Sequence, residues 1–212
     1  PEAISAVRFG PGRPEDLLLY LPERLPLPNT PQFLPACLGE LRRLLSLQAV
    51  GQGFTVLLVD DRPMRQQLAS HLAADFGSRL QVERTAPDSN GILVCGWSFW
   101  QTHRLRLPHP RLLVATTLPI PSLEDPWTAA RVSRYRRDRQ DWFRRYLLPR
   151  SLQRLQQGLA SLRDREALVV LLDSRLLRRS YGQDFLTALE PYRRLQRLAP
   201  DLFAGEADPD LC

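Results

Sequence analysis

The clearest pattern of apolar and polar positions lies in residues 147–173, LLPRSLQRLQQGLASLRDREALVVLLD. The apolar positions of its first half are Leu152, Leu155, Leu159 and Leu162. Their spacing places them on one face of a helix, and Pro149 suits the first turn because proline has no backbone N–H to donate. Residues 167–173 do not alternate between polar and apolar side chains, which predicts a strand buried on both faces. A helix leading into such a strand is the crossover unit of an α/β domain.

Strands and helices alternate along the rest of the chain. Short apolar runs predict strands over residues 17–21, 55–60, 80–84, 92–95 and 112–117. Amphipathic runs predict helices over residues 30–47, 63–76, 126–146 and 183–189, the last extended by residues 193–198. Thr30 and Pro31 are the expected N-cap and first-turn residues of the first helix. This alternation indicates an α/β domain with a parallel, doubly wound sheet.

Length and composition favour one domain. A chain of 212 residues with 43% hydrophobic residues can bury one sizeable core. We expect a flexible leader over residues 1–16, the domain over 17–200 and a disordered tail over 201–212. The chain starts at Pro1 without a signal segment, so we expect a fragment of a longer protein. No apolar run reaches the ~18–20 residues that span a bilayer, which predicts no membrane partner. The three scattered cysteines favour a reducing cytoplasm.

Metal and hydrolytic chemistry find little support in the sequence. The cysteines Cys37, Cys95 and Cys212 are odd in number and far apart, which argues against a disulfide framework, a zinc site or an iron–sulfur cluster. The three histidines lack metal-ligand spacing, and no serine sits in a Gly-x-Ser-x-Gly turn. We therefore predict no metal site in this chain.

All 29 basic residues are arginine, and the net charge is +6. Codon bias could produce this composition without any function. Without lysine, however, the chain cannot carry the phosphate-binding loop Gly-x-x-x-x-Gly-Lys-Ser/Thr or form a Schiff base. The positive charge favours a polyanionic partner.

Arginine is densest in residues 131–146, RVSRYRRDRQDWFRRY, which hold seven arginines and four interleaved aromatic residues. Arginines that follow a phosphate backbone, beside aromatic rings that stack on bases, are typical of single-strand binding. Arg134, Arg136 and Arg137 are the predicted nucleic-acid contacts. The alternative is a solvated helix face whose aromatic residues only form the buried stripe, and the sequence leaves both interpretations open.

Residues 56–72, VLLVDDRPMRQQLASHL, first suggest a receiver domain, in which paired acids bind magnesium. That chemistry also needs a later acceptor aspartate and a lysine. The next strand-like run ends without an aspartate, and the chain has no lysine. Asp60 and Asp61 are therefore interpreted as a strand-end turn and a helix cap.

Five segments together carry a family resemblance: residues 20–33 (YLPERLPLPNTPQF), 56–72 at the place of motif IV, 98–100 (SFW) at the start of motif V, 118–131 (LPIPSLEDPWTAAR) and 171–191 (LLDSRLLRRSYGQDFLTALEP). In this order and spacing they resemble the C-terminal motor domain of DinG-type helicases, relatives of XPD in helicase superfamily 2. The resemblance implies a RecA-like α/β fold, a three-layer sandwich with a mainly parallel sheet.

The resemblance also implies partners and cofactors. In this family ATP and magnesium bind between two RecA-like domains. The first domain supplies the phosphate loop, the magnesium-binding acids and the iron–sulfur cysteines, none of which is in this chain. The expected partners are therefore an N-terminal helicase domain of the same protein and single-stranded DNA or another nucleic acid.

Motif VI of the family, Gln-Gly-x-Gly-Arg-x-x-Arg, directs its arginines at the γ-phosphate of ATP. Gln157 and Gly158 match its start and are the predicted cofactor-binding residues. The positions that depart from the motif are Ala160, Ser161 and Asp164. Arg163 and Arg165 would replace the missing arginines after a shift of register, and they are the predicted catalytic residues.

Motif V departs as well. Ser98 and Trp100 match its start and are predicted to contact nucleic acid, but Gln-Thr-His-Arg follows where the family has Glu-Gly-Val-Asp. An arginine finger contributes ~10³–10⁵ in rate, and a serine cannot supply its charge. The departures favour a weakened or lost ATPase contribution. Three hypotheses stay open: half of a working ATP-dependent DNA helicase, a degenerate module that binds nucleic acid or protein without hydrolysis, or a structural domain with a basic surface.

Overall fold

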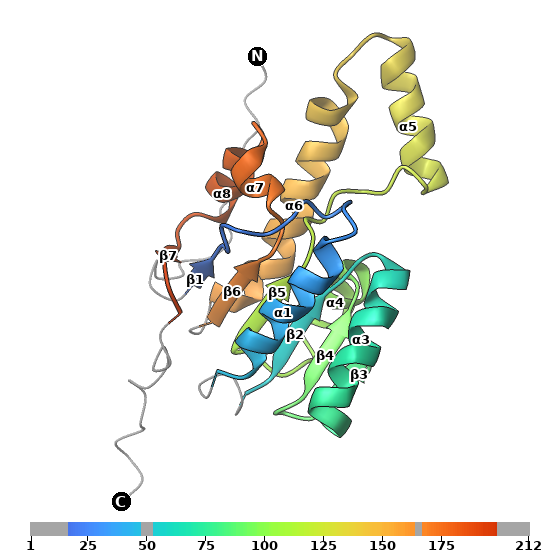
Figure 1. Cartoon of the computed structure of the whole chain (residues 1–212). Helices are drawn as coiled ribbons and strands as arrows, with labels where there is room; N and C mark the ends of the chain where they lie inside the picture. The colour runs from blue at the N-terminus through green and yellow to red at the C-terminus, as the bar shows by residue number, and fades with distance from the viewer. Residues whose placement is uncertain (1–16, 48–52, 164–166, 199–212) are drawn as a thin grey trace, which may run out of the picture.

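The computed structural model describes residues 17–47, 53–163 and 167–198. Its strands form one sheet in the order β3-β4-β2-β5-β6-β1-β7, and every neighbouring pair is parallel. The strands are β1 (Leu17–Tyr20), β2 (Thr55–Leu58), β3 (Leu80–Val82), β4 (Ile92–Cys95), β5 (Leu112–Ala115), β6 (Ala167–Leu171) and β7 (Arg193–Leu195). The helices are α1 (Phe33–Leu45), α3 (Arg62–Phe76), α4 (Trp97–His103), α5 (Pro126–Arg137), α6 (Leu148–Leu159), α7 (Arg175–Arg178) and α8 (Gly182–Leu189). Short helical segments are η1 (Gly77–Arg79), the π-helical η2 (Phe143–Leu147) and η3 (Ala160–Arg163) (Figure 1).

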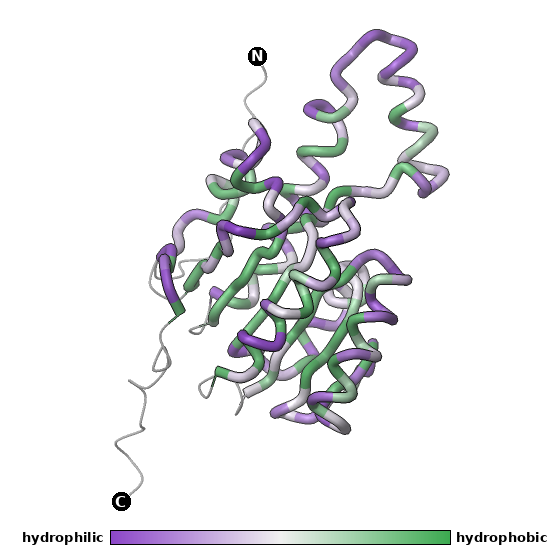
Figure 2. The backbone as a smooth tube through the Cα atoms, in the orientation of Figure 1, coloured by the Kyte–Doolittle hydropathy of each residue, from purple (hydrophilic) through white to green (hydrophobic). Residues whose placement is uncertain are grey.

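Helices pack on both faces of the sheet. Successive strand residues point to opposite sides, so each central strand contributes side chains to two buried clusters. On one side, Leu58 and Leu113 join a cluster with residues of α4, α6 and α8. On the other side, Leu57 and Val114 join a cluster with residues of α1 and α3. The central strands β2, β4, β5 and β6 accordingly appear as a hydrophobic part of the chain in Figure 2. The predicted three-layer α/β sandwich with a parallel sheet is confirmed.

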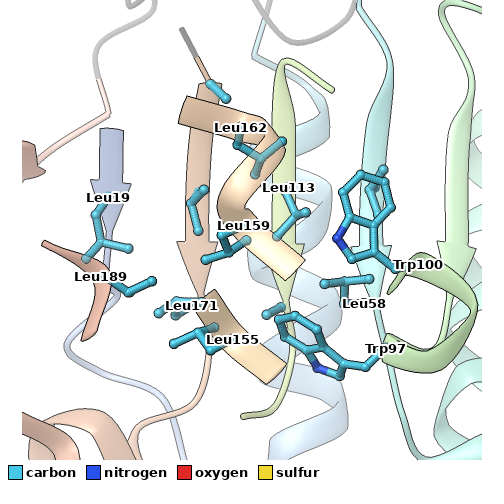
Figure 3. Packing of buried hydrophobic residues seen from close by; sticks show 14 of the residues in the cluster. Leu19, Leu58, Trp97, Trp100, Leu113, Leu155, Leu159, Leu162, Leu171 and Leu189 are labelled. Carbon is cyan, nitrogen blue, oxygen red and sulfur yellow. The ribbon is translucent and has the colours of Figure 1, made fainter. Parts of the chain in front are cut away.

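The predicted crossover from helix to strand is present as α6, η3 and β6. Leu155, Leu159 and Leu162 are buried and face the sheet (Figure 3). Pro149 lies in the first turn of α6 as predicted, but the helical backbone begins earlier, because the π-helical η2 leads directly into α6. Figure 3 also shows that α6 runs antiparallel to β6. The start of α6 therefore lies at the carboxyl edge of the sheet, and its end lies at the amino edge.

A close contact joins α4 to α6. Trp97 and Trp100 of α4 have no exposed surface, and the Trp100 indole N–H donates to the Gly158 carbonyl at 2.7 Å. A Cβ atom on Gly158 would lie 2.7 Å from Cζ3 of Trp97. Gly158 is therefore required by packing, because any side chain there would collide with a buried ring.

The predicted helix over residues 126–146 is instead two helical segments. The first, α5, ends at Arg137, and the chain turns at Arg139, whose φ is +53°. Asp141 then accepts a hydrogen bond from the Arg144 N–H at 3.0 Å and starts η2, which continues into α6. We call residues 126–147 the arm, because they project from the body of the domain (Figure 1).

Two further expectations were wrong. The Thr30 hydroxyl donates to the Leu27 carbonyl at 2.7 Å and closes a turn, so α1 begins later, at Phe33, rather than at a Thr30 cap. Residues 193–195 form β7, which pairs with β1, and do not extend a helix. The expected leader (1–16) and tail (201–212) lie outside the described residues. None of the described helices is long and apolar enough to cross a membrane.

Replacing Gly158 by alanine is expected to lower the free energy of unfolding by about 1–3 kcal/mol, the usual cost of overpacking a core. Gly39, which is exposed on α1 with no atom within 4 Å of an added Cβ, provides the matched control. Gly39→Ala is expected to raise stability by about 0.5–1 kcal/mol, because alanine favours a helix. Urea denaturation of both variants measures the difference, and equal effects would contradict the packing role of Gly158.

Candidate functional site

A polar cleft of about 600 Å³ lies beyond the carboxyl ends of β2 and β5. Its walls are the start of α4, the connection from β5 to α5, the first turn of α5 and one side of η2 and α6. Open parallel sheets bind ligands at this edge, and sites of this kind usually measure ~300–1,000 Å³. The cleft is therefore the candidate site of this domain.

One side of η2 and α6 supplies more of the cleft's polar groups than any other wall. They are Tyr146, Arg150, Gln153, Arg154 and Gln157. Their spacing of three and four residues keeps them on one side of the helix. The buried leucines occupy the opposite side, so packing against the sheet turns the polar side towards the cleft. This spacing was the sequence signal for Arg150 and Arg154, which motif comparison missed.

Asp60 connects two walls of the cleft. One carboxylate oxygen accepts the Trp97 N–H at 2.9 Å, and the other lies 3.7 Å from a guanidinium nitrogen of Arg154. Arg154 also lies 3.5 Å from the Ser98 hydroxyl and from the Pro119 carbonyl. These contacts are long, so Arg154 is held near the mouth of the cleft without a short hydrogen bond.

Asp125 and Asp61 act as helix caps. Asp125 accepts the Thr128 N–H at 2.8 Å at the start of α5, and this hydrogen bond lowers the pKa of its carboxyl group. Asp61 accepts the Met64 N–H at 2.7 Å at the start of α3, as predicted from the sequence. The cleft thus contains two arginines, Arg150 and Arg154, and two acids, Asp60 and Asp125, and is close to neutral.

The arm carries the surplus of positive charge. Two of its aromatic residues face each other between α5 and η2, where the rings of Tyr135 and Tyr146 stack with centroids 6.1 Å apart. The guanidinium of Arg136 lies 4.9 Å from the Trp142 ring centroid, a cation–π contact. The predicted nucleic-acid contacts Arg134, Arg136 and Arg137 are all exposed. Figure 2 shows that hydrophilic residues follow the backbone along the outer part of the arm.

The residues carried over from motif V fall in two environments. Ser98 is exposed and lines the cleft. Trp100 has no exposed surface, and its one donor is bonded to Gly158. Trp100 therefore packs α4 against α6, and its burial argues against the predicted contact with nucleic acid.

The residues carried over from motif VI are not brought together. Gln157 lines the cleft, but Gly158 is buried and its carbonyl is bonded to Trp100. Arg163 donates to the carbonyls of Leu189 and Pro191, and burial lowers the pKa of its guanidinium. It lies nine residues after Arg154, roughly 13 Å along the helix. The other predicted catalytic residue, Arg165, lies outside the described residues.

Two of the positions carried over from motif VI are engaged in hydrogen bonds within the domain. Gly158 offers no free group, and Arg163 already donates to two backbone carbonyls. Within the described ranges, no cluster of three or more His, Cys, Asp or Glu residues could hold a metal ion. Cys37 and Cys95 are buried free thiols, and burial raises the pKa of Cys37 to about 12. No chemical step through a nucleotide is therefore assigned to these residues.

The carboxyl end of β6 has a structural role. Asp173 is buried and accepts the Leu118 N–H at 2.9 Å, while Arg175 donates to both of its oxygens. This ion pair holds the connection that leads from β5 to the cleft. Asp173 therefore holds the start of the connection that forms one wall of the cleft, and its two oxygens are occupied by Leu118 and Arg175.

Replacing Arg163 by methionine is expected to lower the free energy of unfolding by about 1–3 kcal/mol, because two carbonyls lose their donor. The exposed Arg62 provides a control, and Arg62→Met is expected to change stability by less than about 0.5 kcal/mol. Chemical denaturation compares the two variants. An unchanged free energy of unfolding in Arg163→Met would contradict the proposed anchoring of the Leu189 and Pro191 carbonyls by Arg163.

Comparison with known proteins agrees with this fold. Residues 44–192 match the helicase C-terminal domain family. The chain is 29% identical over 210 residues to ATP-dependent DNA helicase YoaA of Haemophilus influenzae, covering 92% of this chain and 32% of that protein. It is 28% identical over 197 residues to the Escherichia coli protein of the same name, covering 86% and 30%. It thus spans about a third of the length of these relatives. The chain belongs to the helicase C-terminal domain family, as its resemblance to DinG-type helicases predicted.

Proposed function

We propose that this chain is the C-terminal motor domain of a DinG/YoaA-type ATP-dependent DNA helicase and that it binds single-stranded DNA. The relatives it matches are ATP-dependent DNA helicases by name. The observation that carries the binding proposal is the continuity of the arginine-rich arm with the cleft. Tyr146 belongs to both, since its ring stacks on Tyr135 within the arm and it lines the cleft.

The arm supplies the long-range attraction. Its exposed arginines outnumber its two acids, Asp138 and Asp141, so a phosphate backbone that lies along it would release condensed counterions. Asp141 is also occupied in starting η2, which keeps its carboxylate close to backbone N–H groups. The charge of the arm therefore provides affinity that does not depend on base sequence.

The cleft would fix the position of the bound strand. Arg150 and Arg154 are charged donors, and the hydroxyls of Ser98 and Thr128 stand beside them. Donors of these kinds contact phosphate oxygens and fix the register of a bound strand. We propose that the strand runs from the arm into the cleft at Arg150.

Removal of two arm arginines tests the binding surface. For Arg134→Gln with Arg137→Gln, we expect weaker binding of a labelled oligo(dT) and a log–log salt slope that is smaller by about 1.4, at ~0.7 per phosphate contact. Arg193→Gln with Arg194→Gln on β7 removes the same charge far from the arm and is expected to preserve the slope. Fluorescence anisotropy over a salt series measures both variants.

The unmodified chain should show a slope steeper than about −3, corresponding to four or more phosphate contacts. No binding in low salt would exclude the nucleic-acid role and leave a structural α/β domain. Equal effects of the arm and β7 variants would show that only net charge matters and would exclude the arm as the specific surface.

We further propose that this domain contributes weakly to ATP hydrolysis. Ser161 stands where the family has its first arginine, and Arg163 is held by backbone carbonyls. The magnesium and the phosphate loop would come from an N-terminal motor domain. The alternative is a module that binds nucleic acid or protein without hydrolysis; it shares the same surface and differs only in turnover.

ATPase measurements on the full-length protein separate these possibilities. We expect hydrolysis that is slow and changes less than twofold when Arg165 is replaced by alanine. The same is expected for Arg163→Ala together with Arg165→Ala, provided that circular dichroism verifies folding at the assay temperature. DNA-stimulated hydrolysis that the double variant abolishes would contradict the weakened contribution and support a working motor.

A further inference from the structure

Trp127 is a large apolar side chain left in solvent. Its side chain is 82% exposed, whereas Trp97 and Trp100 are fully buried. The fourth tryptophan, Trp142, is partly buried and covered by the Arg136 guanidinium. Among the large apolar residues in the described part of the chain, Trp127 is the most exposed, followed by Leu105 at 79%.

The local structure holds Trp127 rigidly beside the cleft. It lies in the first turn of α5, between Pro126 and Thr128. The Asp125 side chain caps this turn, and both Asp125 and Thr128 line the cleft. The cap and the proline fix the backbone of this turn, and with it the direction in which the Trp127 side chain leaves the helix.

Positive charge follows Trp127 along one face of α5. Arg131 lies one turn later on the same face, about 6 Å away between Cβ atoms. Its guanidinium lies over the ring of Tyr146, 5.9 Å from the centroid, and Tyr146 lines the cleft. Trp127, Arg131 and Tyr146 therefore form a continuous strip at the mouth of the cleft, which we call the rim.

We propose that Trp127 is a stacking platform for one base of a single-stranded nucleic acid whose phosphates contact Arg131 and Arg150. This inference rests on the proposed DNA-binding function and adds the residue that distinguishes single strands from duplexes. The indole face stacks on any base, so the contact tolerates sequence, whereas bases in a duplex are already stacked. Glu124 and Asp125 precede Trp127 and repel phosphates, which places the backbone on the Arg131 side.

An apolar protein partner fits the rim less well. A stable protein interface buries roughly 800 Å² on each side, whereas one tryptophan offers about 150–250 Å². Leu123, in the connection before α5, is 44% exposed and adds little area. Arg131 and Arg134, further along the helix, suit a phosphate backbone better than an apolar surface.

Substitutions of Trp127 test the stacking contact. For Trp127→Ala we expect oligo(dT) binding, measured by anisotropy, to weaken by about 5- to 100-fold, the usual effect of losing one stacked base. Trp127→Phe retains a ring and is expected to stay within about threefold of the unmodified chain. Leu105→Ala removes a side chain that is 79% exposed outside the arm, and it is expected to leave binding unchanged.

Tryptophan fluorescence gives an independent readout on the same 212-residue chain. Oligo(dT) should quench the emission of the unmodified chain, because Trp127 is exposed while Trp97 and Trp100 are buried. Trp127→Phe should remove this quenching, and Trp142→Phe should preserve it. Binding of a hairpin duplex should respond little to Trp127→Ala.

Two outcomes would overturn the inference separately from the proposed function. Oligo(dT) affinity unchanged in Trp127→Ala, with quenching retained in Trp127→Phe, would leave DNA binding intact and exclude stacking. A duplex affinity that falls as much as the single-strand affinity would show a general structural effect. If the unmodified chain binds no oligo(dT) at low salt, both proposals fail together.

Discussion

The approach of α4 to α6 at Gly158 sets the geometry of the cleft. Because Gly158 has no side chain, the Trp97 ring lies against the α6 backbone and the Trp100 indole N–H reaches the Gly158 carbonyl. A neutral hydrogen bond of this kind contributes about 1 kcal/mol, but leaving the buried indole N–H unpaired would cost roughly 1–3 kcal/mol. The two helices thus have one favoured spacing, and it brings Ser98 of α4 to 3.5 Å from Arg154 of α6.

The direction of α6 and η3 separates Arg163 from the two arginines that line the cleft. Arg150 and Arg154 lie at the carboxyl edge of the sheet, whereas Arg163 lies towards the amino edge and holds the turn after α8. A shift by one helical turn moves a residue by only ~5.4 Å, less than half of the ~13 Å between Arg154 and Arg163. Arg163 therefore does not line the cleft in this structure, and the arginines that line it are ones that motif comparison did not indicate.

Periodicity predicted the elements better than their connections. The leucines of α6 and the uninterrupted apolar run of β6 correctly gave a helix and a doubly buried strand. The same criterion missed the reversal inside the arm. Tyr135 and Tyr146 are eleven residues apart, close to three turns of one continuous helix, so their spacing looks helical. In the structure they stack across a hairpin, and the Asp141 cap was the signal that the reversal left in the sequence.

Motif position was a weaker guide than burial. Trp100 matches a motif residue, yet a sequence match does not tell which side of a seven-residue helix faces the core. Trp127 matches no motif residue singled out in the sequence, and only its exposure draws attention to it. The short β7 was missed for a related reason. Its Arg193 and Arg194 look like a helix surface, but charged residues are also usual on an edge strand, where they discourage pairing with other chains.

The ion pair between Asp60 and Arg154 limits how much binding free energy the cleft would contribute, compared with the arm. The side chains of Arg154 and Asp60 are 24% and 34% exposed, and a partly exposed pair of this kind contributes only about 0–1 kcal/mol. A hydrogen bond to a charged group contributes roughly 1.5–3 kcal/mol, so a phosphate would displace Asp60 from Arg154 at a small net gain. Asp60 would keep its short bond to the Trp97 N–H and would stay near the new anion, which limits that gain. Under the proposed function, affinity therefore comes mainly from the arm and the rim, and the cleft sets the position of the strand.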